Sequence, residues 1–309
     1  MSPWMNLLHT LPGLLAQLVL VLLAPPLLQG VISRVKARFA GRQGPPLLQP
    51  TRDIWRLLRK GMVRSTTTTW VFQAGPVVAL ATTLLASLLV PMGEASAPLS
   101  FAGDLILLAY LLGLGRFFTV LAAMDTGSAF EGMGAAREAT WAALAEPALL
   151  LGFLAGVHVS GSLSLAGILA RPPMLVTGGA PLVLVLVSFF IVLLAENSRI
   201  PFDDPTTHLE LTMVHEVMVL DHSGPALGMI LYGAAMKLLL FSALIVRMLL
   251  PFSGRFWLDQ LAFAAGLLAV AITIGVVEST TARLQLSKVP RLLVSACLLS
   301  VFALVLVSR

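Results

Sequence analysis

Charge is scarce in this sequence. Charged residues make up 11% of its 309 residues and apolar residues 58%, whereas a soluble domain carries roughly 25% charged residues. The mean hydropathy is +0.93. A soluble domain of this composition would expose much apolar surface, and a disordered chain would need far more charge. Both classes are excluded, and the composition predicts a polytopic helical membrane protein.

Cysteine is almost absent. Cys297 is the one cysteine of the chain. A disulfide framework, a zinc finger and a cysteine-held iron–sulfur cluster each need more cysteines than this. We therefore expect no metal site and no cofactor in this chain, so that any redox centre it serves lies in another chain.

Long apolar runs define the predicted architecture. A membrane-spanning helix needs about 20 mostly apolar residues, and eight segments meet this criterion. They are Leu11–Ile32, Val71–Met92, Gly103–Ala123, Ala139–Val159, Leu175–Ala195, Ala226–Leu249, Leu258–Val277 and Leu292–Val307. The predicted fold class is an all-α polytopic membrane protein with about eight transmembrane helices. Residues 1–309 form a single membrane domain, because no second domain and no short repeat is evident.

Positive charge is concentrated in the first predicted loop. Nine basic residues and one acidic residue lie between Ser33 and Thr69, and the rest of the chain has 11 basic and 14 acidic residues. With eight spans, fourteen basic residues face one side and four face the other. The positive-inside rule makes the first side cytoplasmic and places both termini outside. Loops 33–70, 124–138, 196–225 and 278–291 then form a cytoplasmic docking face, and nucleic-acid binding is not favoured.

Several ionisable residues fall within or beside the predicted spans, where charge is costly. Glu146 and Lys237 lie about two turns inside, and Arg116 also lies within a span. Pro147 removes a backbone hydrogen bond beside Glu146, so this site suits proton relay, with a purely structural kink as the alternative. Glu138 sits at a span end, where its side chain can instead reach the interface.

The segment from Glu196 to Gly224 carries six acids and one base, Arg199, on the side that is normally positive. Asp204–Pro205 is typical of a helix start, and the predicted helix runs to about Leu220. Its three histidines are seven residues apart, roughly 10 Å along a helix, which is too far for one ion. Contacts with a partner subunit or proton relay are favoured over a metal site.

The first loop combines a rigid turn with an amphipathic helix. The sequence G-R-Q-G-P-P-L-L-Q-P from Gly41 to Pro50 precedes a stretch, Thr51–Lys60, in which apolar and basic residues alternate by face. Such a helix lies in the membrane interface. Two interpretations remain open, namely contact with lipid headgroups and docking of a peripheral subunit.

The motif E-N-S-R-I-P-F-D, from Glu196 to Asp203, resembles the one after the fifth helix of the membrane subunit that anchors the peripheral arm of respiratory complex I. The first loop is similar to a shortened form of that family's first loop. The stretch D-D-P-T-T-H-L-E-L-T-M-V-H-E resembles the formate hydrogenlyase and hydrogenase-4 branch. The resemblance covers essentially the whole chain. The departures from complex I relatives, at Pro205–His208 and around Asp221, count against quinone binding.

The resemblance implies a non-catalytic membrane subunit in the bacterial cytoplasmic (inner) membrane. It would seat the large and small subunits of a [NiFe]-hydrogenase and an iron–sulfur subunit, which hold the [NiFe] centre and the clusters. With antiporter-like membrane subunits, it would couple electron transfer to proton or sodium movement. Three alternatives remain: a quinone-linked complex I subunit, a stand-alone secondary transporter, and a hydrogenase-related complex with another redox partner.

The resemblance and the charge pattern together predict two groups of site residues. The expected proton pathway comprises Glu146, Glu196, Asp203, Asp204, Glu210, Glu216, Asp221, Arg116, Lys237 and Glu138. The expected subunit-docking residues are Arg42, Gln43, Gln49, Asp53, Arg56, Arg199, His208 and His215.

Overall fold

The computed structural model describes residues 3–93, 97–169, 179–203, 213–252 and 254–308. Within these ranges the regular structure is helical and no strand occurs. The elements are α1 (Pro3–Phe39), α2 (Gln49–Leu58), α3 (Trp70–Ser87), α4 (Asp104–Asp125), α5 (Ala129–Ser160), α6 (Leu165–Leu169), α8 (Ala180–Glu196), α9 (His215–Met218), α10 (Gly224–Leu249), α11 (Phe256–Thr280), η1 (Leu286–Lys288) and α12 (Val289–Val307).

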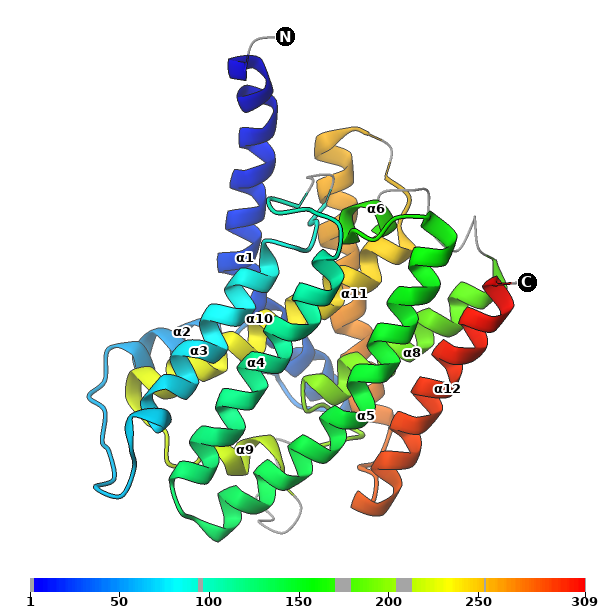
Figure 1. The fold of residues 1–309 in the computed structure, drawn as a ribbon. Coiled ribbons are helices and arrows are strands. Elements are labelled where there is room, and N and C mark those ends of the chain that lie inside the picture. The colour runs from blue at the N-terminus through cyan, green and yellow to red at the C-terminus, as the bar shows by residue number, and fades with distance from the viewer. Residues whose placement is uncertain (1–2, 94–96, 170–178, 204–212, 253, 309) are drawn as a thin grey trace.

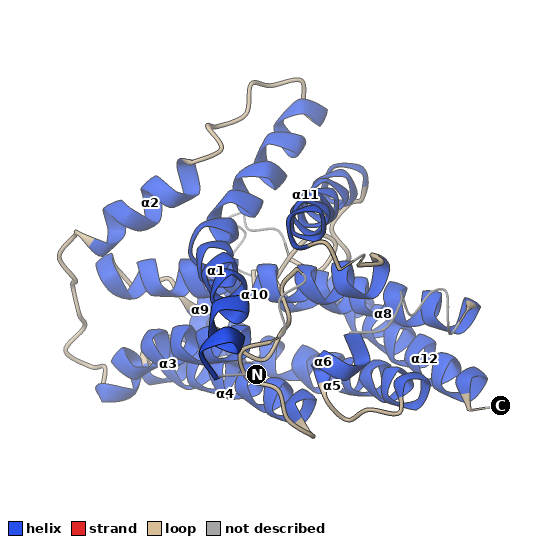
Figure 2. Cartoon of the chain, turned by 90° about the horizontal axis from the view of Figure 1, so that it is seen from above, coloured by secondary structure: helices blue, strands red, loops and turns tan. Residues whose placement is uncertain are grey.

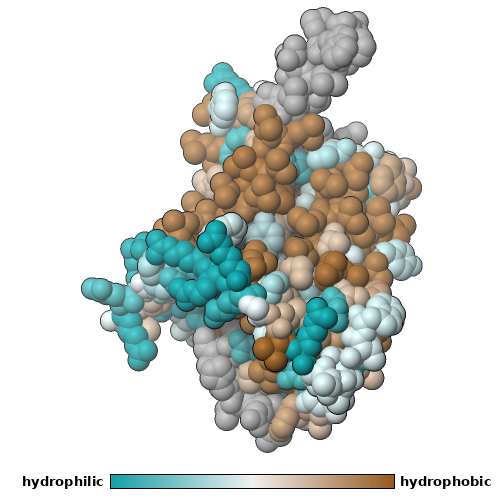
Figure 3. Space-filling model, turned by 90° about the vertical axis from the view of Figure 1, so that its left-hand side faces the viewer, coloured by the Kyte–Doolittle hydropathy of each residue, from teal (hydrophilic) through white to brown (hydrophobic). Residues whose placement is uncertain are grey.

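The membrane-protein prediction is confirmed. Seven helices of the described residues are long and apolar enough to cross a membrane. The remaining predicted span, the fifth at Leu175–Ala195, is represented by α8, an apolar helix of 17 residues. Large apolar side chains remain exposed along α1, α4 and α12, and Figure 3 shows apolar side chains over a broad part of one face. These exposed side chains suit a lipid environment.

α10 is the central helix. In its most apolar window 72% of the residues are buried, against 28–44% in the other spanning helices. Figure 2 shows α10 between the row α3, α4 and α5 on one side and α1 and α11 on the other, with α2 at the outer edge. A residue on α10 can therefore meet several helices at once.

Small residues and one carboxylate bring α3 against α4. A Cβ on Gly75 would lie 2.7 Å from the Ala122 methyl group, so only glycine permits this approach. At the end of α4, Asp125 accepts hydrogen bonds from the backbone N–H groups of Thr69 and Phe72, at 2.7 and 3.2 Å. These bonds satisfy donors that the start of a helix leaves free.

The loops fall on two sides of the helix bundle (Figure 1). The segments after α1, α4, α8 and α11 share the side that carries α2, and α12 ends on the opposite side. This alternation agrees with eight crossings. The basic first loop and the acidic segment around α9 therefore lie on the same side, called the α2 side below.

Two boundaries differ from the prediction in a way that matters for the site. α5 begins at Ala129, ten residues before the predicted span, and α11 extends to Thr280. Glu131, Glu138 and Glu278 are therefore helical residues, and residues 129–138 are not a loop. The apolar-run criterion ended each span at its first charges, although the backbone continues as a helix past the membrane boundary.

Candidate functional site

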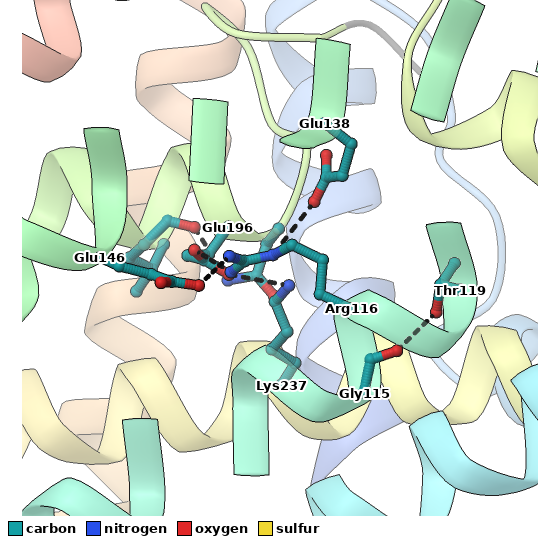
Figure 4. A network of polar contacts seen from close by, with 9 residues as sticks. Gly115, Arg116, Thr119, Glu138, Glu146, Glu196 and Lys237 are labelled. Atoms are coloured by element: carbon teal, nitrogen blue, oxygen red, sulfur yellow. Dashed lines mark hydrogen bonds and ion pairs between the residues drawn. The ribbon is translucent and has the colours of Figure 1, made fainter. Parts of the chain in front are cut away.

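Arg116 is the centre of a network of charged side chains drawn from four helices (Figure 4). Its side chain on α4 is 8% exposed. The guanidinium pairs with Glu138 on α5 at 3.5 Å, with Glu146 on α5 at 2.6 Å, and with Glu196 at the end of α8. One cation thus gathers three carboxylates from two other helices.

Lys237 on α10 completes the network. Its Nζ lies 2.9 Å from Oε2 of Glu196, so Glu196 is shared between two cations. The network holds three carboxylates and two cations, an excess of one negative charge when all are ionised. A buried ion pair is stable only when each charge keeps its partners, so moving a proton on or off one carboxylate changes the balance of the whole network.

A cavity of about 80 Å³ adjoins these charges. Glu138, Glu196 and Lys237 line it together with Arg116 and His215. A water molecule needs roughly 10–15 Å³ of such space, so the cavity has room for about five waters. Small residues of α3, α4 and α10 open this space, namely Ala79, Thr82, Gly115, Gly233 and Ala234.

Glu146 differs from its partners in exposure. Its side chain is 47% exposed, whereas those of Glu196 and Glu138 are 6% and 13% exposed. It lies within α5 next to Pro147, more than two turns from Glu138. A carboxylate on the outer surface at membrane depth is costly unless it meets water or another protein.

A second cluster lies on the α2 side. Glu278 at the end of α11 pairs with Lys36 of α1 at 2.9 Å and with Arg199 at 3.4 Å. Asp203 accepts hydrogen bonds from the backbone N–H groups of Val214 and His215, and it pairs with Arg283 at 3.1 Å. These contacts attach the first part of the acidic segment to α11 and to the loop after it, and they attach residues 214 and 215 to Asp203.

The predicted long helix in the acidic segment is wrong within residues 213–221. Only α9, His215–Met218, is helical there, followed by a turn through Asp221. Glu216 lies in α9, and Asp221 is exposed beyond it. The remaining predicted site residues of this segment, Asp204, His208 and Glu210, lie outside the described residues. The Asp203 carboxylate accepts hydrogen bonds from the N–H groups of residues 214 and 215. In the predicted helix these N–H groups would instead bond to backbone carbonyl groups four residues earlier.

The two described histidines of this segment have different surroundings. His215 lines the cavity, and burial lowers its pKa to about 4, with Lys237 acting in the same direction and Asp203 against it. Burial also lowers the pKa of His222 to about 4, against the opposing effect of Asp221. The His222 ring stacks on Phe72 at 4.0 Å. Among the described residues, no group of three potential ligands could hold a metal ion.

The predicted docking residues of the first loop lie on an open surface. Arg42, Gln43 and Arg56 are exposed, and Gln49 donates a hydrogen bond to Asp53 at 2.9 Å within α2. α2 packs on α10 through the apolar side chains of Leu57 and Leu58 at Gly228. The exposed side of α2 carries Trp55, 56% exposed, with the Arg59 guanidinium 4.3 Å from the ring centre.

Arg199 is the exception among the predicted docking residues. Its side chain is 15% exposed and points at Glu278 instead of lying on an open surface. His215, another predicted docking residue, faces the cavity. Both residues therefore lie inside the subunit, where they hold or face the acidic segment.

Sequence reasoning missed two buried acids, Asp259 at the start of α11 and Glu131 beside the acidic segment. Glu131 is 1% exposed and accepts a hydrogen bond from the backbone N–H of Asp221 at 3.2 Å. It precedes Glu138 by seven residues, and a spacing of seven puts two residues on one helix face. That spacing was the available signal, but the predicted span began only at Ala139.

Comparison with models of protein families shows to which family this chain belongs. The model of the family described as NADH dehydrogenase matches residues 13–308. The chain belongs to this family. It is 32% identical to formate hydrogenlyase subunit 4 of Escherichia coli (strain K12), over 90% of this chain and 92% of the relative. It is 34% identical to hydrogenase-4 component C of the same organism, over 84% of this chain and 81% of the relative.

Two further proteins are less similar in sequence to this chain. An NADH-quinone oxidoreductase subunit of Neisseria meningitidis serogroup C (strain 053442) is 26% identical, over 66% of this chain and 58% of that protein. A chain in the structure of the membrane-bound sulfane sulfur reductase, an archaeal respiratory membrane complex, has the same fold. Its TM-score is 0.80 at 22% identity, with 94% of this chain and 99% of that chain covered.

These comparisons confirm the family resemblance stated from the sequence. The relatives are named as parts of formate hydrogenlyase, hydrogenase-4 and NADH-quinone oxidoreductase, and the solved structure is that of a respiratory membrane complex. The chain is a multi-span membrane protein of that kind. A stand-alone secondary transporter is not favoured, because the matches extend over nearly the whole chain and are to subunits of larger complexes.

Proposed function

We propose that this chain anchors a [NiFe]-hydrogenase module to the membrane and couples its electron transfer to proton or sodium translocation. The relatives at 32% and 34% identity carry hydrogenase and formate hydrogenlyase names, which supports a hydrogenase partner over a quinone-linked one. The [NiFe] centre and the iron–sulfur clusters belong to partner subunits, because a chain with one cysteine has no ligand set for them.

The module docks on the α2 side, which faces the cytoplasm in this proposal, with both termini outside. The exposed side chains of Arg42, Gln43 and Arg56 lie there, beside the acidic segment. Figure 3 shows most of the hydrophilic side chains of this face in the lower half of the view, below a broad apolar surface that suits lipid. The partners expected on this side are the large, small and iron–sulfur subunits, and antiporter-like subunits adjoin within the membrane.

The observation that carries the coupling role is the network around Arg116. It joins Glu196, at the end of α8 next to the docking side, to Glu146 on the outer surface of the bundle. A change of charge at the docked module alters the proton affinity of nearby carboxylates. Because the carboxylates share Arg116 and Lys237, that change also alters the proton affinity of Glu146. A neighbouring membrane subunit can exchange protons with Glu146 at this position.

Glu146→Gln tests this proposal. The variant removes the ionisable group but keeps the shape of the side chain, so the complex should assemble and retain hydrogenase activity with soluble dyes. Ion translocation per hydrogen in reconstituted vesicles should fall severalfold. Glu146→Asp is the matched control, because it keeps the carboxylate and should retain more coupling than Glu146→Gln. Undiminished coupling in Glu146→Gln would remove Glu146 from the pathway.

The partners can be tested directly. The tagged chain is extracted in mild detergent, and the proteins that purify with it are identified, with assays of nickel, iron and viologen-linked hydrogen oxidation. We expect nickel, hydrogenase activity and antiporter-like subunits. If the chain purifies alone and free of metal under conditions that preserve other membrane complexes, the anchoring role is wrong.

A further inference from the structure

Four other acids in the described part of the chain show two ways in which a carboxylate inside this subunit is satisfied. Glu138, Glu196 and Glu278 each face a lysine or arginine within 3.5 Å. Asp104, fully buried at the start of α4, instead accepts backbone hydrogen bonds, from Leu165 at 2.6 Å and from Phe101 at 3.4 Å. Each of these carboxylates therefore has donors for its negative charge.

Glu131 follows neither pattern. It is 1% exposed, and its Oε1 accepts the Asp221 backbone N–H, but its Oε2 is buried without a hydrogen-bond partner. The nearby Thr126 hydroxyl donates to the Ala123 carbonyl oxygen at 2.8 Å. The charged group with which Glu131 interacts is another carboxylate, Asp221. No lysine or arginine pairs with it among the described residues.

These surroundings suit a carboxyl group that carries a proton. An ionised carboxylate is costly to bury without a cation, and a second carboxylate nearby adds to that cost. A protonated Glu131 relieves both costs and gains a donor, so its O–H can be shared with Asp221. Asp221 is exposed, which gives this pair access to water.

The pair stands at one end of a row of carboxyls on α5. Glu131, Glu138 and Glu146 are spaced seven and eight residues apart, roughly 10–12 Å at each step, and share one side of the helix. A Cβ on Gly134 would lie 2.8 Å from the Val214 carbonyl oxygen, so the segment 214–221 lies directly on α5. His215 and Met218 of that segment line the cavity that also contains Glu138.

We infer that Glu131 and Asp221 form a proton-holding carboxyl pair at the α2-side end of this row, which exchanges protons with water and supplies them to the carboxyls around the cavity. The transfer is of a proton alone: the Glu131 O–H bond breaks, intervening water carries the proton to the Glu138 carboxylate, and Glu131 takes up another proton from bulk water through Asp221. The destination of the proton rests on the proposed coupling function, whereas the protonation of Glu131 does not.

Infrared spectroscopy of the purified complex tests the protonation. At neutral pH we expect a C=O stretching band of a buried protonated carboxyl that shifts in D₂O and is lost in Glu131→Gln. This variant keeps an oxygen for the Asp221 N–H. Glu138→Gln is the matched control, on the same helix face, and should leave the band in place because Glu138 is paired with Arg116. Identical spectra of Glu131→Gln and the parent protein would overturn the inference.

Asp221→Asn provides an independent variant at an exposed position. It removes the partner carboxylate without altering the buried side chain, and we expect the Glu131 band to shift in frequency. An unshifted band would show that the two carboxyls do not share the proton and would overturn the pair.

Translocation in vesicles separates this inference from the proposed function. We expect Glu131→Gln to keep dye-linked hydrogenase activity and to reduce translocation severalfold. If Glu146→Gln loses coupling and Glu131→Gln does not, the proposed function stands and the proton-supplying role of Glu131 is wrong. If neither variant affects coupling, the proposed function fails, while the infrared band still decides whether Glu131 holds a proton.

Discussion

The two ion-pair clusters of this subunit have opposite compositions. Around Arg116, three carboxylates share two cations beside a cavity. Around Glu278, one carboxylate with no exposed surface holds two cations, Lys36 and Arg199. An acid-rich cluster next to water can gain or lose a proton at modest cost. Around Glu278 each carboxylate oxygen pairs with a different cation, so the second cluster is a fixed connection between α1, α11 and the acidic segment.

Among the substitutions that test the difference between the two clusters, Arg116→Gln should have the largest effect on the stability of the complex. The change leaves the Glu138 and Glu196 carboxylates without their shared cation at a buried site. Removing one partner of a buried ion pair costs about 3–5 kcal/mol, so we expect a large loss of assembled complex, measured by thermal unfolding and by yield in detergent. Arg116→Lys should recover part of it, because one ammonium group can still pair with one carboxylate. A normal yield of Arg116→Gln would show that the carboxylates do not depend on this cation.

Glu278→Gln should act on stability without acting on coupling. The variant leaves Lys36 and Arg199 facing an amide, but their side chains are 26% and 15% exposed and can turn toward water. We expect a smaller loss, about 2–3 kcal/mol, in thermal unfolding. The complexes that remain should translocate as many ions per hydrogen as the parent. If fewer ions were translocated per hydrogen, the Glu278 cluster would also take part in coupling, and the two clusters would not differ in role.

The difference between the clusters also explains what the sequence could predict. Glu146, Glu196, Arg116 and Lys237 stood out because charge is rare in apolar spans, and the structure brings all four together. The role of these residues remains a prediction. Their partnership could not be read from the sequence, since it depends on which faces of α4, α5, α8 and α10 meet.

The acidic segment was predicted less well, for a physical reason. Its composition and start signal favoured a helix, but the Asp203 carboxylate accepts the N–H groups of Val214 and His215. A tertiary contact thus replaces the local hydrogen bonds on which helix prediction depends. Arg199 was likewise expected at a docking surface, because the sequence does not show that Glu278 lies within reach of it.

His222 gives the smallest expected effect and tests the segment that lies beyond α9, outside both clusters. Burial lowers its pKa from 6.5 to about 4, so the unfolded chain binds a proton more readily than the folded one between these values. Stability is therefore fully present above about pH 6.5 and falls as the pH drops toward 4. At pH 5 the loss due to His222 is about 2 kcal/mol.

His222→Phe removes this titration while keeping a ring to stack on Phe72. Thermal unfolding at pH 7 and pH 5 should show a smaller decrease for the variant than for the parent, and the remaining decrease includes His215, whose pKa is also lowered to about 4. His215 lines the cavity beside Lys237 and Glu196, so its protonation adds positive charge to the acid-rich cluster. An equal decrease in the parent and in His222→Phe would mean that the acid sensitivity of the fold arises at the cavity and not at the His222 stack.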